Sequence, residues 1–236
     1  MEAKKEKDAC RALALSRRRT QSADERRERS LALCRLLESL PVLRGAGTVL
    51  GYIPAGSECD LLPFYETLRQ KGVTLAFPVT AADGGMEAYV PEGDLAPGLF
   101  GVPEPDPLLS RRLTPEELDA VLVPCVGFDG ALRRLGHGMG FYDRYLARCR
   151  RAAAILTAFE AQRLERVPTE PHDRAFPSLS PSGACFGNKP LYHKRGMLSH
   201  PSFRSYAIPA YFCLTASSFC WVACSAGYQP RSAISL

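Results

Sequence analysis

A run of alternating glycines is the part of the sequence best suited to chemistry. It reads Arg134-Leu135-Gly136-His137-Gly138-Met139-Gly140 and continues directly into Phe141-Tyr142-Asp143. Glycines allow backbone conformations and close approaches that a Cβ would prevent. Successive amides ahead of a helix form an anion site, and the guanidinium of Arg134 can fork onto a phosphate. The run therefore predicts a loop that holds the phosphates of ATP.

The same run carries a carboxylate in position to hold a metal ion. Asp143 lies one turn into the expected helix, where it can take a hard Mg²⁺ ion that bridges phosphate oxygens. The run lacks the Gly-Lys-Ser/Thr ending of a P-loop, and it is not a complete dinucleotide-binding fingerprint. From physics alone, a flexible glycine-rich turn between a strand and a helix is the alternative interpretation.

The elements that must position this run alternate between strands and helices. Apolar periodicity predicts helices over residues 4–19, 22–40 and 60–69 and after Gly140, and strands over 48–53, 73–77, 86–90, 118–126 and 152–159. The strand over 118–126 is apolar on both faces, as a central parallel strand is. Residues 91–118, rich in Pro and Gly, are expected to form a long ordered loop. The pattern predicts an α/β fold, a single three-layer domain with a mostly parallel central sheet and helices on both faces.

Composition and charge limit the classes of function. The 236-residue chain is 46 % hydrophobic and 23 % charged, which is ordinary for a globular protein. Residues 2–29 are charged throughout and do not resemble a secretory signal, and their acidic members argue against a mitochondrial transit peptide. The apolar stretch 208–224 is shorter than the about 20 residues of a membrane span. We expect a cytoplasmic protein without a membrane partner.

The charge of the chain changes abruptly after Asp173. All 25 acidic residues lie in residues 1–173 with 24 of the 30 basic ones, so this part carries a formal charge of −1 and the remainder +6. The net positive charge of the chain therefore comes from the tail and not from the domain, and we expect no nucleic-acid partner. We expect residues 1–175 to form the domain and residues 176–236 to form an irregular tail rich in Ser, Pro and Cys. The odd count of nine cysteines argues against a closed disulfide framework.

The glycine run and the strand before it form one long motif. VLVPCVGFDG, followed by RRLGHGMGFYDRYL, resembles the signature of the 5-formyltetrahydrofolate cyclo-ligase (methenyltetrahydrofolate synthetase) family, P-G-x-x-F-D-x-x-G-x-R-L-G-x-G-x-G-Y-Y-D-x-Y-L. Further stretches resemble other elements of that family, in order and with similar spacing: Lys7-x-x-x-Arg11, YIPAGSECD at 52–60, LFGVPEP at 99–105 and VPTEPHD at 167–173. The resemblance covers roughly residues 4–173.

The resemblance implies an ATP-dependent enzyme that cyclises 5-formyltetrahydrofolate to 5,10-methenyltetrahydrofolate and releases ADP and phosphate. It implies ATP contacts from Lys7, Arg11, Arg134, Leu135, Gly136, His137, Gly138, Met139, Gly140, Phe141 and Tyr142, and catalytic roles for Arg134, Tyr142 and Asp143. It also implies folate contacts from Glu58 and Phe100, and Mg²⁺ ligands in Asp143 and Asp173. We expect a monomer whose partner is the reduced folate.

Other interpretations of these residues stand beside those roles. Lys7 and Arg11 are also typical of a solvated helix face, Glu58 of a loop acid, and Asp173 of a turn. Tyr142 is equally suited to a core position. His137 occupies a variable position of the motif, and we expect it to be exposed and incidental.

The chain departs from the family in two places. Phe141 replaces a tyrosine, which removes a hydroxyl and keeps the ring. After Asp173 the family continues with an apolar strand, whereas residues 174–181 contain Pro177 and Pro181, which do not suit an interior strand. We infer an alternative C-terminus in place of the last core strand. A catalytically impaired isoform that keeps only ATP or folate binding is therefore a second hypothesis, and a nucleic-acid-associated scaffold is a third.

Overall fold

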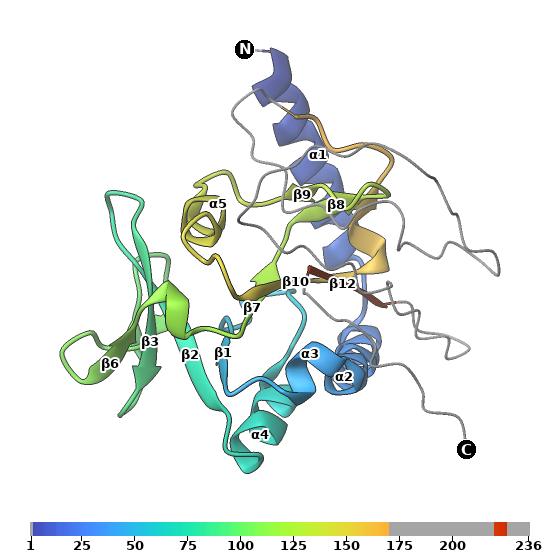
Figure 1. Cartoon of the computed structure of the whole chain (residues 1–236). Coiled ribbons are helices and arrows are strands. Elements are labelled where there is room, and N and C mark those ends of the chain that lie inside the picture. Colours follow the sequence, from blue (N-terminus) through green and yellow to red (C-terminus); the bar gives the residue numbers. More distant parts are fainter. Residues whose placement is uncertain (1, 170–219, 226–236) are drawn as a thin grey trace, which may run out of the picture.

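Apolar segments of the chain assemble into one sheet, shown in Figure 1, in a computed structural model that describes residues 2–169 and 220–225. The sheet has seven strands in the order β12-β10-β7-β1-β2-β3-β6. Their bounds are β1 Thr48–Leu50, β2 Thr74–Thr80, β3 Met86–Pro91, β6 Ser110–Leu113, β7 Ala120–Pro124, β10 Ala153–Phe159 and β12 Cys220–Ser225. The chain crosses over between strands, as in other layered α/β domains.

The middle of the sheet is parallel. β7 lies between β1 and β10 and pairs with both in parallel, and β1 pairs with β2 in parallel as well. Residues 120–123 of β7 have no exposed surface, because both faces of the strand are covered. The predicted central strand and the predicted parallel crossover from β1 to β2 are confirmed, and the antiparallel pairs lie toward the two edges.

Helices cover both faces of this sheet, as predicted. On one face, α2 (Ala23–Ser39), α3 (Pro41–Arg44) and α4 (Leu62–Gln70) bury apolar side chains against the strands. The buried leucines of α2 include Leu33 and Leu37, which have no exposed surface. On the other face, α5 (Phe141–Leu146) contributes Tyr145 to a second apolar cluster with residues of β1 and β7. The core therefore consists of two layers separated by the sheet.

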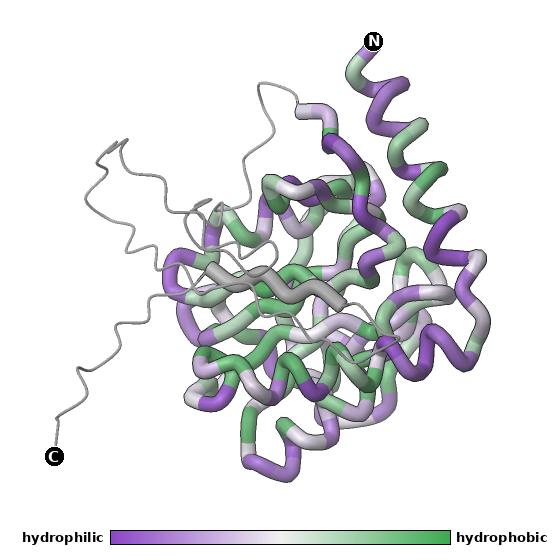
Figure 2. The backbone as a smooth tube through the Cα atoms, turned by 90° about the vertical axis from the view of Figure 1, so that its right-hand side faces the viewer, coloured by the Kyte–Doolittle hydropathy of each residue, from purple (hydrophilic) through white to green (hydrophobic). Residues whose placement is uncertain are grey.

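The N-terminal helix stands at one side of this body. α1 (Glu2–Arg19) is largely hydrophilic along its length, as Figure 2 shows. It packs against β8 (Gly127–Asp129), η2 (Glu160–Gln162) and β11 (Arg163–Leu164). β8 pairs with β11 and with β9 (Arg134–Leu135), so the small sheet β11-β8-β9 brings the start of the glycine run beside α1. The capping box predicted at Ser22, which begins α2, is present with Glu25 as its partner.

The segment between β3 and β7 is more regular than predicted. It holds β4 (Ala96–Pro97), β5 (Pro103–Glu104), β6 and η1 (Pro115–Glu117) in place of one long loop. β6 pairs with β3 at the edge of the sheet. Its sequence Ser-Arg-Arg-Leu buries only Leu113, so its composition gives no apolar pattern from which a strand is predicted.

One strand lies in the part of the chain for which no regular period is predicted. β12 pairs with β10 in antiparallel register from Ala154↔Ser225 to Phe159↔Cys220. The edge of β10 is thereby paired by a strand from the stretch that was expected to form an irregular tail. His172, Asp173 and residues 174–181 lie outside the described residues. Among the helices that the structure describes, none has the length and apolar composition to cross a membrane.

Candidate functional site

One face of α1 supplies cations to the site. Lys7, Arg11, Ala14 and Arg18 follow one another at spacings of four, three and four residues, which places them on one face of a helix. Lys7 is 8 % exposed and Arg18 is 5 % exposed, so the interpretation of Lys7 as part of a solvated face is wrong. Arg11 donates from Nε to the carbonyl oxygen of Gly136 at 2.9 Å. Arg11, one of the two predicted cations, therefore lies beside the glycine run.

The glycines of the run leave room for two arginine side chains. A Cβ on Gly136 would lie 2.9 Å from the guanidinium nitrogens of Arg134, and one on Gly138 would lie 3.3 Å from Nη2 of Arg11. Gly138 has φ +101° and Gly140, the N-cap of α5, has φ +68°, values that favour glycine. α5 spans only six residues, so an anion here would depend on the loop amides and the arginines more than on a helix dipole.

Arg134 connects the residues that were predicted to be catalytic. Its Nε donates to the carbonyl oxygen of Pro124 at 3.0 Å, which fixes the side chain against the end of β7. Its guanidinium lies 5.4 Å from the ring centroid of Tyr142, and its Nη1 lies 3.4 Å from Oδ1 of Asp143. The side chain of Arg134 is 8 % exposed, whereas that of Asp143 is 51 % exposed. The structure thus brings these residues together with the carboxylate facing solvent.

Burial controls the ionisation of the tyrosine in this group. Burial raises the pKa of Tyr142 well above its ordinary value, and the nearby cation of Arg134 lowers it only in part. The phenol is therefore a neutral hydrogen-bond donor at physiological pH. Tyr142 packs at the margin of the apolar cluster on the α5 side of the sheet, so its ring takes part in the core.

Glu58 lies at the centre of the other half of the site. Its side chain is 11 % exposed. Its Oε2 accepts from the amide of Ala55 at 3.1 Å, and its Oε1 lies 3.8 Å from Nη1 of Arg18 and 3.6 Å from Nε2 of His137. Glu58 is therefore a largely buried loop acid that lies between two basic groups. His137 is 61 % exposed at its side chain, as predicted, but it contacts the site.

Arg18 is the site residue that the sequence analysis missed. It donates from Nε to Oγ of Ser57 at 2.9 Å, and its Nη1 lies 3.8 Å from Oε1 of Glu58. Its position one heptad after Arg11 on the same helical face is the signal that identifies it. The sequence alone does not distinguish Arg18 from the other arginines at the end of the helix, because the packing of α1 decides which of them faces the domain.

Two aromatic rings meet beside the glycine run. The ring centroids of Phe100 and Phe141 are 5.7 Å apart in an edge-to-face arrangement. Phe100 is 55 % exposed and comes from the turn between β4 and β5. Glu104 of β5 accepts from the amide and the hydroxyl of Thr80 at 3.1 and 2.7 Å, which ties that hairpin to the end of β2. The hydrogen bonds between Glu104 and Thr80 therefore hold the predicted folate-contacting loop where Phe100 contacts Phe141.

Asp129 organises the turn that precedes the glycine run. It has no exposed surface, and its Oδ2 accepts from Nε of Arg133 at 2.7 Å and from the amide of Val167 at 2.8 Å. Val167 begins the stretch that ends in Asp173, the second predicted Mg²⁺ ligand, which lies outside the described residues. Asp129 therefore fixes Val167, the described start of that stretch, to the turn before the glycine run.

The donor groups at the site suit a metal ion that arrives with a nucleotide. Across residues 2–169, no group of three or more His, Cys, Asp or Glu side chains is arranged to hold a metal ion. Mg²⁺ bound with a nucleotide takes one or two carboxylates from the protein and its other ligands from phosphate and water. The exposed carboxylate of Asp143 beside the glycine run fits that requirement.

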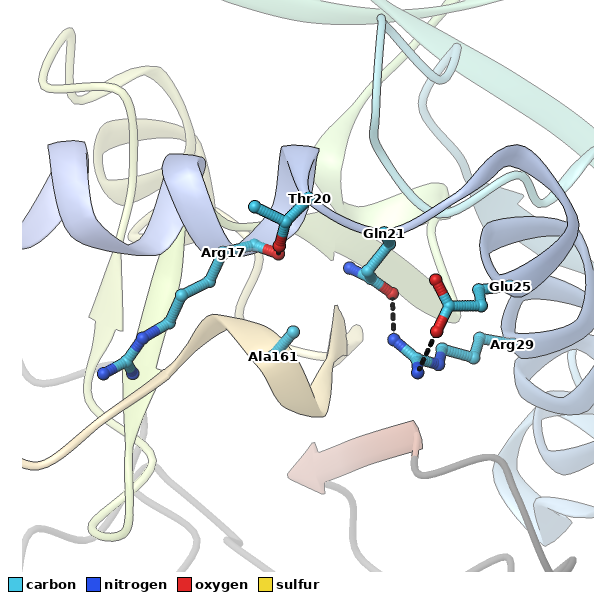
Figure 3. Close-up of a pocket in the computed structure, with 6 residues that line it drawn as sticks. All are labelled: Arg17, Thr20, Gln21, Glu25, Arg29 and Ala161. Carbon is cyan, nitrogen blue, oxygen red and sulfur yellow. Dashed lines mark hydrogen bonds and ion pairs between the residues drawn. The ribbon is translucent and has the colours of Figure 1, made fainter.

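A surface depression of about 320 Å³ lies elsewhere, where the end of α1 meets the start of α2. Figure 3 shows the residues that line it: Arg17, Thr20, Gln21, Glu25, Arg29 and Ala161. The guanidinium of Arg29 donates hydrogen bonds there to the side-chain oxygens of Gln21 and Glu25. None of the predicted site residues lines this depression, so it is separate from the group around the glycine run.

Comparison with known proteins identifies relatives of one kind. A sequence model of the 5-formyltetrahydrofolate cyclo-ligase family matches residues 3–179. The 5-formyltetrahydrofolate cyclo-ligase of Mycolicibacterium smegmatis is 35 % identical over 135 residues, covering 54 % of this chain and 70 % of the relative. That of Escherichia coli K12 is 27 % identical over 169 residues, covering 69 % and 93 %.

Solved structures agree with the sequence comparisons. The NMR structure of Aquifex aeolicus 5,10-methenyltetrahydrofolate synthetase matches with a TM-score of 0.63 and 28 % identity, covering 83 % of this chain and 97 % of that one. A 5,10-methenyltetrahydrofolate synthetase from Mycoplasma pneumoniae has the same fold, with a TM-score of 0.58, 24 % identity and coverage of 70 % and 92 %. Every part of the site described above lies inside the matched residues 3–179.

Proposed function

Because this chain belongs to the 5-formyltetrahydrofolate cyclo-ligase family, we propose that it converts 5-formyltetrahydrofolate and ATP to 5,10-methenyltetrahydrofolate, ADP and phosphate. One observation carries the proposal. Arg11 from the N-terminal helix and Arg134 from the glycine run meet around the same glycines, beside an exposed carboxylate. That combination suits a triphosphate, since it joins cations and close backbone approach with a ligand for the accompanying metal ion.

The reaction is a phosphoryl transfer followed by ring closure. The formyl oxygen attacks the γ-phosphorus of ATP and ADP leaves, which gives an N5-iminium phosphate. The N10 nitrogen then attacks the activated carbon, and phosphate leaves with the former formyl oxygen. Neither step needs a covalent bond to the protein, so the enzyme acts by positioning the reactants and by offsetting charge.

The residues around the glycine run divide the work on ATP. Residues 135–141 enclose the phosphates, and Lys7, Arg11 and Arg134 offset their charge. The neutral hydroxyl of Tyr142 donates a hydrogen bond to the transferring group. Asp143, with Asp173, holds Mg²⁺, which when bound neutralises charge on the phosphate oxygens.

The Glu58 side of the site receives the folate. The carboxylate of Glu58 accepts hydrogen bonds from the pterin, and Arg18, which is itself bonded to Ser57, keeps that carboxylate oriented. Phe100 and Phe141 offer ring faces and edges to the aromatic parts of the substrate. In this proposal residues 1–175 carry the catalytic site, and the protein acts as a cytoplasmic monomer.

Absorbance of the methenyl product in the near ultraviolet tests the proposal. The protein is incubated with 5-formyltetrahydrofolate, ATP and Mg²⁺, and compared with Asp143→Asn and with Asp94→Asn, an exposed carboxylate outside the site. We expect product from the wild type and from Asp94→Asn, and a loss of about a hundredfold or more in Asp143→Asn. Folded wild-type protein that binds ATP and forms no product would contradict the proposal.

A further inference from the structure

One arginine of α5 bridges two turns that are distant in sequence. Arg144 donates to the carbonyl oxygen of Gly84 from Nε at 3.2 Å and from Nη2 at 2.7 Å. Its Nη2 also donates to the carbonyl oxygen of Met139 at 2.8 Å. Gly84 lies in the turn between β2 and β3, and Met139 belongs to the glycine run. The guanidinium therefore ties the run to the tip of the β2–β3 hairpin, which lies on the side where α5 packs against β3.

The backbone on both sides leaves room for this guanidinium. A Cβ on Gly84 would lie 2.6 Å from Nη2 of Arg144, and a Cβ on Gly140 would lie 2.8 Å from Nη1. Both glycines have positive φ, +88° and +68°. The guanidinium also lies 5.7 Å from the ring centroid of Phe141, a distance at which a cation is attracted to the ring face. Arg144 thus contacts three consecutive residues of the run, Met139 to Phe141.

We infer that Arg144 is a positioning residue for ATP binding, which acts by holding Met139, Gly140 and Phe141 in the conformation that receives the phosphates. Hydrogen bonds from a charged donor are stronger than neutral ones, and a planar fork can reach two carbonyls at once. A loop that is ordered before ligand arrives loses less conformational entropy on binding. The inference rests on the proposed function, because that function gives the loop its ligand.

Arg144→Gln and Arg144→Lys test this role, with Arg148→Gln as the matched control. Arg148 lies one turn later and pairs with Glu87 at 2.7 Å, so the control removes the same charge without touching the glycine run. We expect the KM for ATP to rise about tenfold in both Arg144 variants, the effect of losing about 1.4 kcal/mol of binding free energy. The kcat and the KM for folate should stay within about twofold, as should all three constants in Arg148→Gln.

Gly84→Ala reaches the same contact from the opposite side. The added Cβ displaces the guanidinium, so the variant should raise the KM for ATP as Arg144→Gln does. Combining the two substitutions should add no further increase, because both remove one interaction. Full additivity of the two effects would overturn the inference.

Hydrogen exchange at the amides of residues 138–141 gives a readout that does not need turnover. These amides should exchange several-fold faster in Arg144→Gln and at the wild-type rate in Arg148→Gln. If the wild type is inactive but shows that exchange pattern, the proposed function is contradicted. The conclusion that Arg144 orders residues 138–141 is then still supported. Unchanged loop exchange, or an unchanged KM for ATP with a lowered Tm, would reduce Arg144 to a stabilising residue and overturn the inference.

Discussion

Arg11 and Gly136 are 125 residues apart in the chain and joined by a hydrogen bond of 2.9 Å from the guanidinium Nε to the carbonyl oxygen. Through this bond α1 holds the glycine run from the side opposite to α5. The bond adds to the apolar packing of Ala14, which joins α1 to Val126 and Leu135 of the domain.

Replacing Arg11 should weaken ATP binding. In Arg11→Gln the bond to Gly136 and one positive charge are lost, so we expect the KM for ATP to rise about tenfold or more, corresponding to about 1.4 kcal/mol or more. Arg19→Gln, an exposed residue of the same helix, serves as the control and should leave the KM unchanged. Steady-state kinetics with varied ATP measure both. Equal KM values for the two variants would contradict a role of Arg11 in the site.

Arg18 should affect the folate and not the nucleotide. Arg18→Met removes the cation that faces the nearly buried carboxylate of Glu58, so that carboxylate loses a charged partner and its orientation. We expect the KM for 5-formyltetrahydrofolate to rise about tenfold, with a smaller change for ATP. Arg17→Met, the exposed neighbour, is the control. A variant whose only defect is a lower Tm would show that Arg18 supports folding alone.

Two buried tyrosines should respond in opposite ways to loss of the hydroxyl. The hydroxyl of Tyr145 is buried without a hydrogen-bond partner among the described residues, so Tyr145→Phe should be neutral or stabilising by up to about 1 kcal/mol. The hydroxyl of Tyr65 accepts from the amide of Tyr52 at 2.9 Å and donates to its carbonyl oxygen at 2.8 Å. Tyr65→Phe should therefore lower the free energy of unfolding by about 1–3 kcal/mol. Urea unfolding of both variants measures the difference, and the reverse order would contradict the described contacts.

The same burial predicts a loss of stability at alkaline pH. Burial raises the pKa values of Tyr52, Tyr65 and Tyr145 above the ordinary value of tyrosine. The unfolded chain releases these protons near pH 10 while the folded protein retains them, so the free energy of unfolding falls as pH rises above about 10. Urea unfolding between pH 8 and 11 should show this fall, with a shallower slope in Tyr145→Phe. An identical slope in that variant would exclude Tyr145 as a contributor.

The sequence predicts the interior of this fold better than its edges. β7 and β10 are apolar on both faces, and the structure places them side by side at positions that are fully covered. β6 is polar because it lies at an edge, where only one of its side chains is buried. Its existence depends on pairing with β3, a non-local contact that no local pattern records.

The candidate site divides in a similar way. The glycine run, Arg134 and Asp143 are contiguous, so their type and spacing suffice to predict that they act together. The approach of Phe100 to Phe141 and of Arg18 to Glu58 depends on how β5 and α1 dock. Nothing in the intervening sequence determines those distances, which is why Arg18 was missed and why Glu58 and Phe100 were predicted from resemblance alone.

The antiparallel pairing of β12 with β10 has a consequence for biosynthesis. Phe159 ends β10, and its partner Cys220 is translated only after a long intervening stretch. During that interval one edge of β10 is unpaired, although the side chains of this strand are all buried in the finished protein. Such an edge is a site for premature association between chains emerging from neighbouring ribosomes. Chaperone capture of the growing polypeptide is therefore most useful between the synthesis of these two strands.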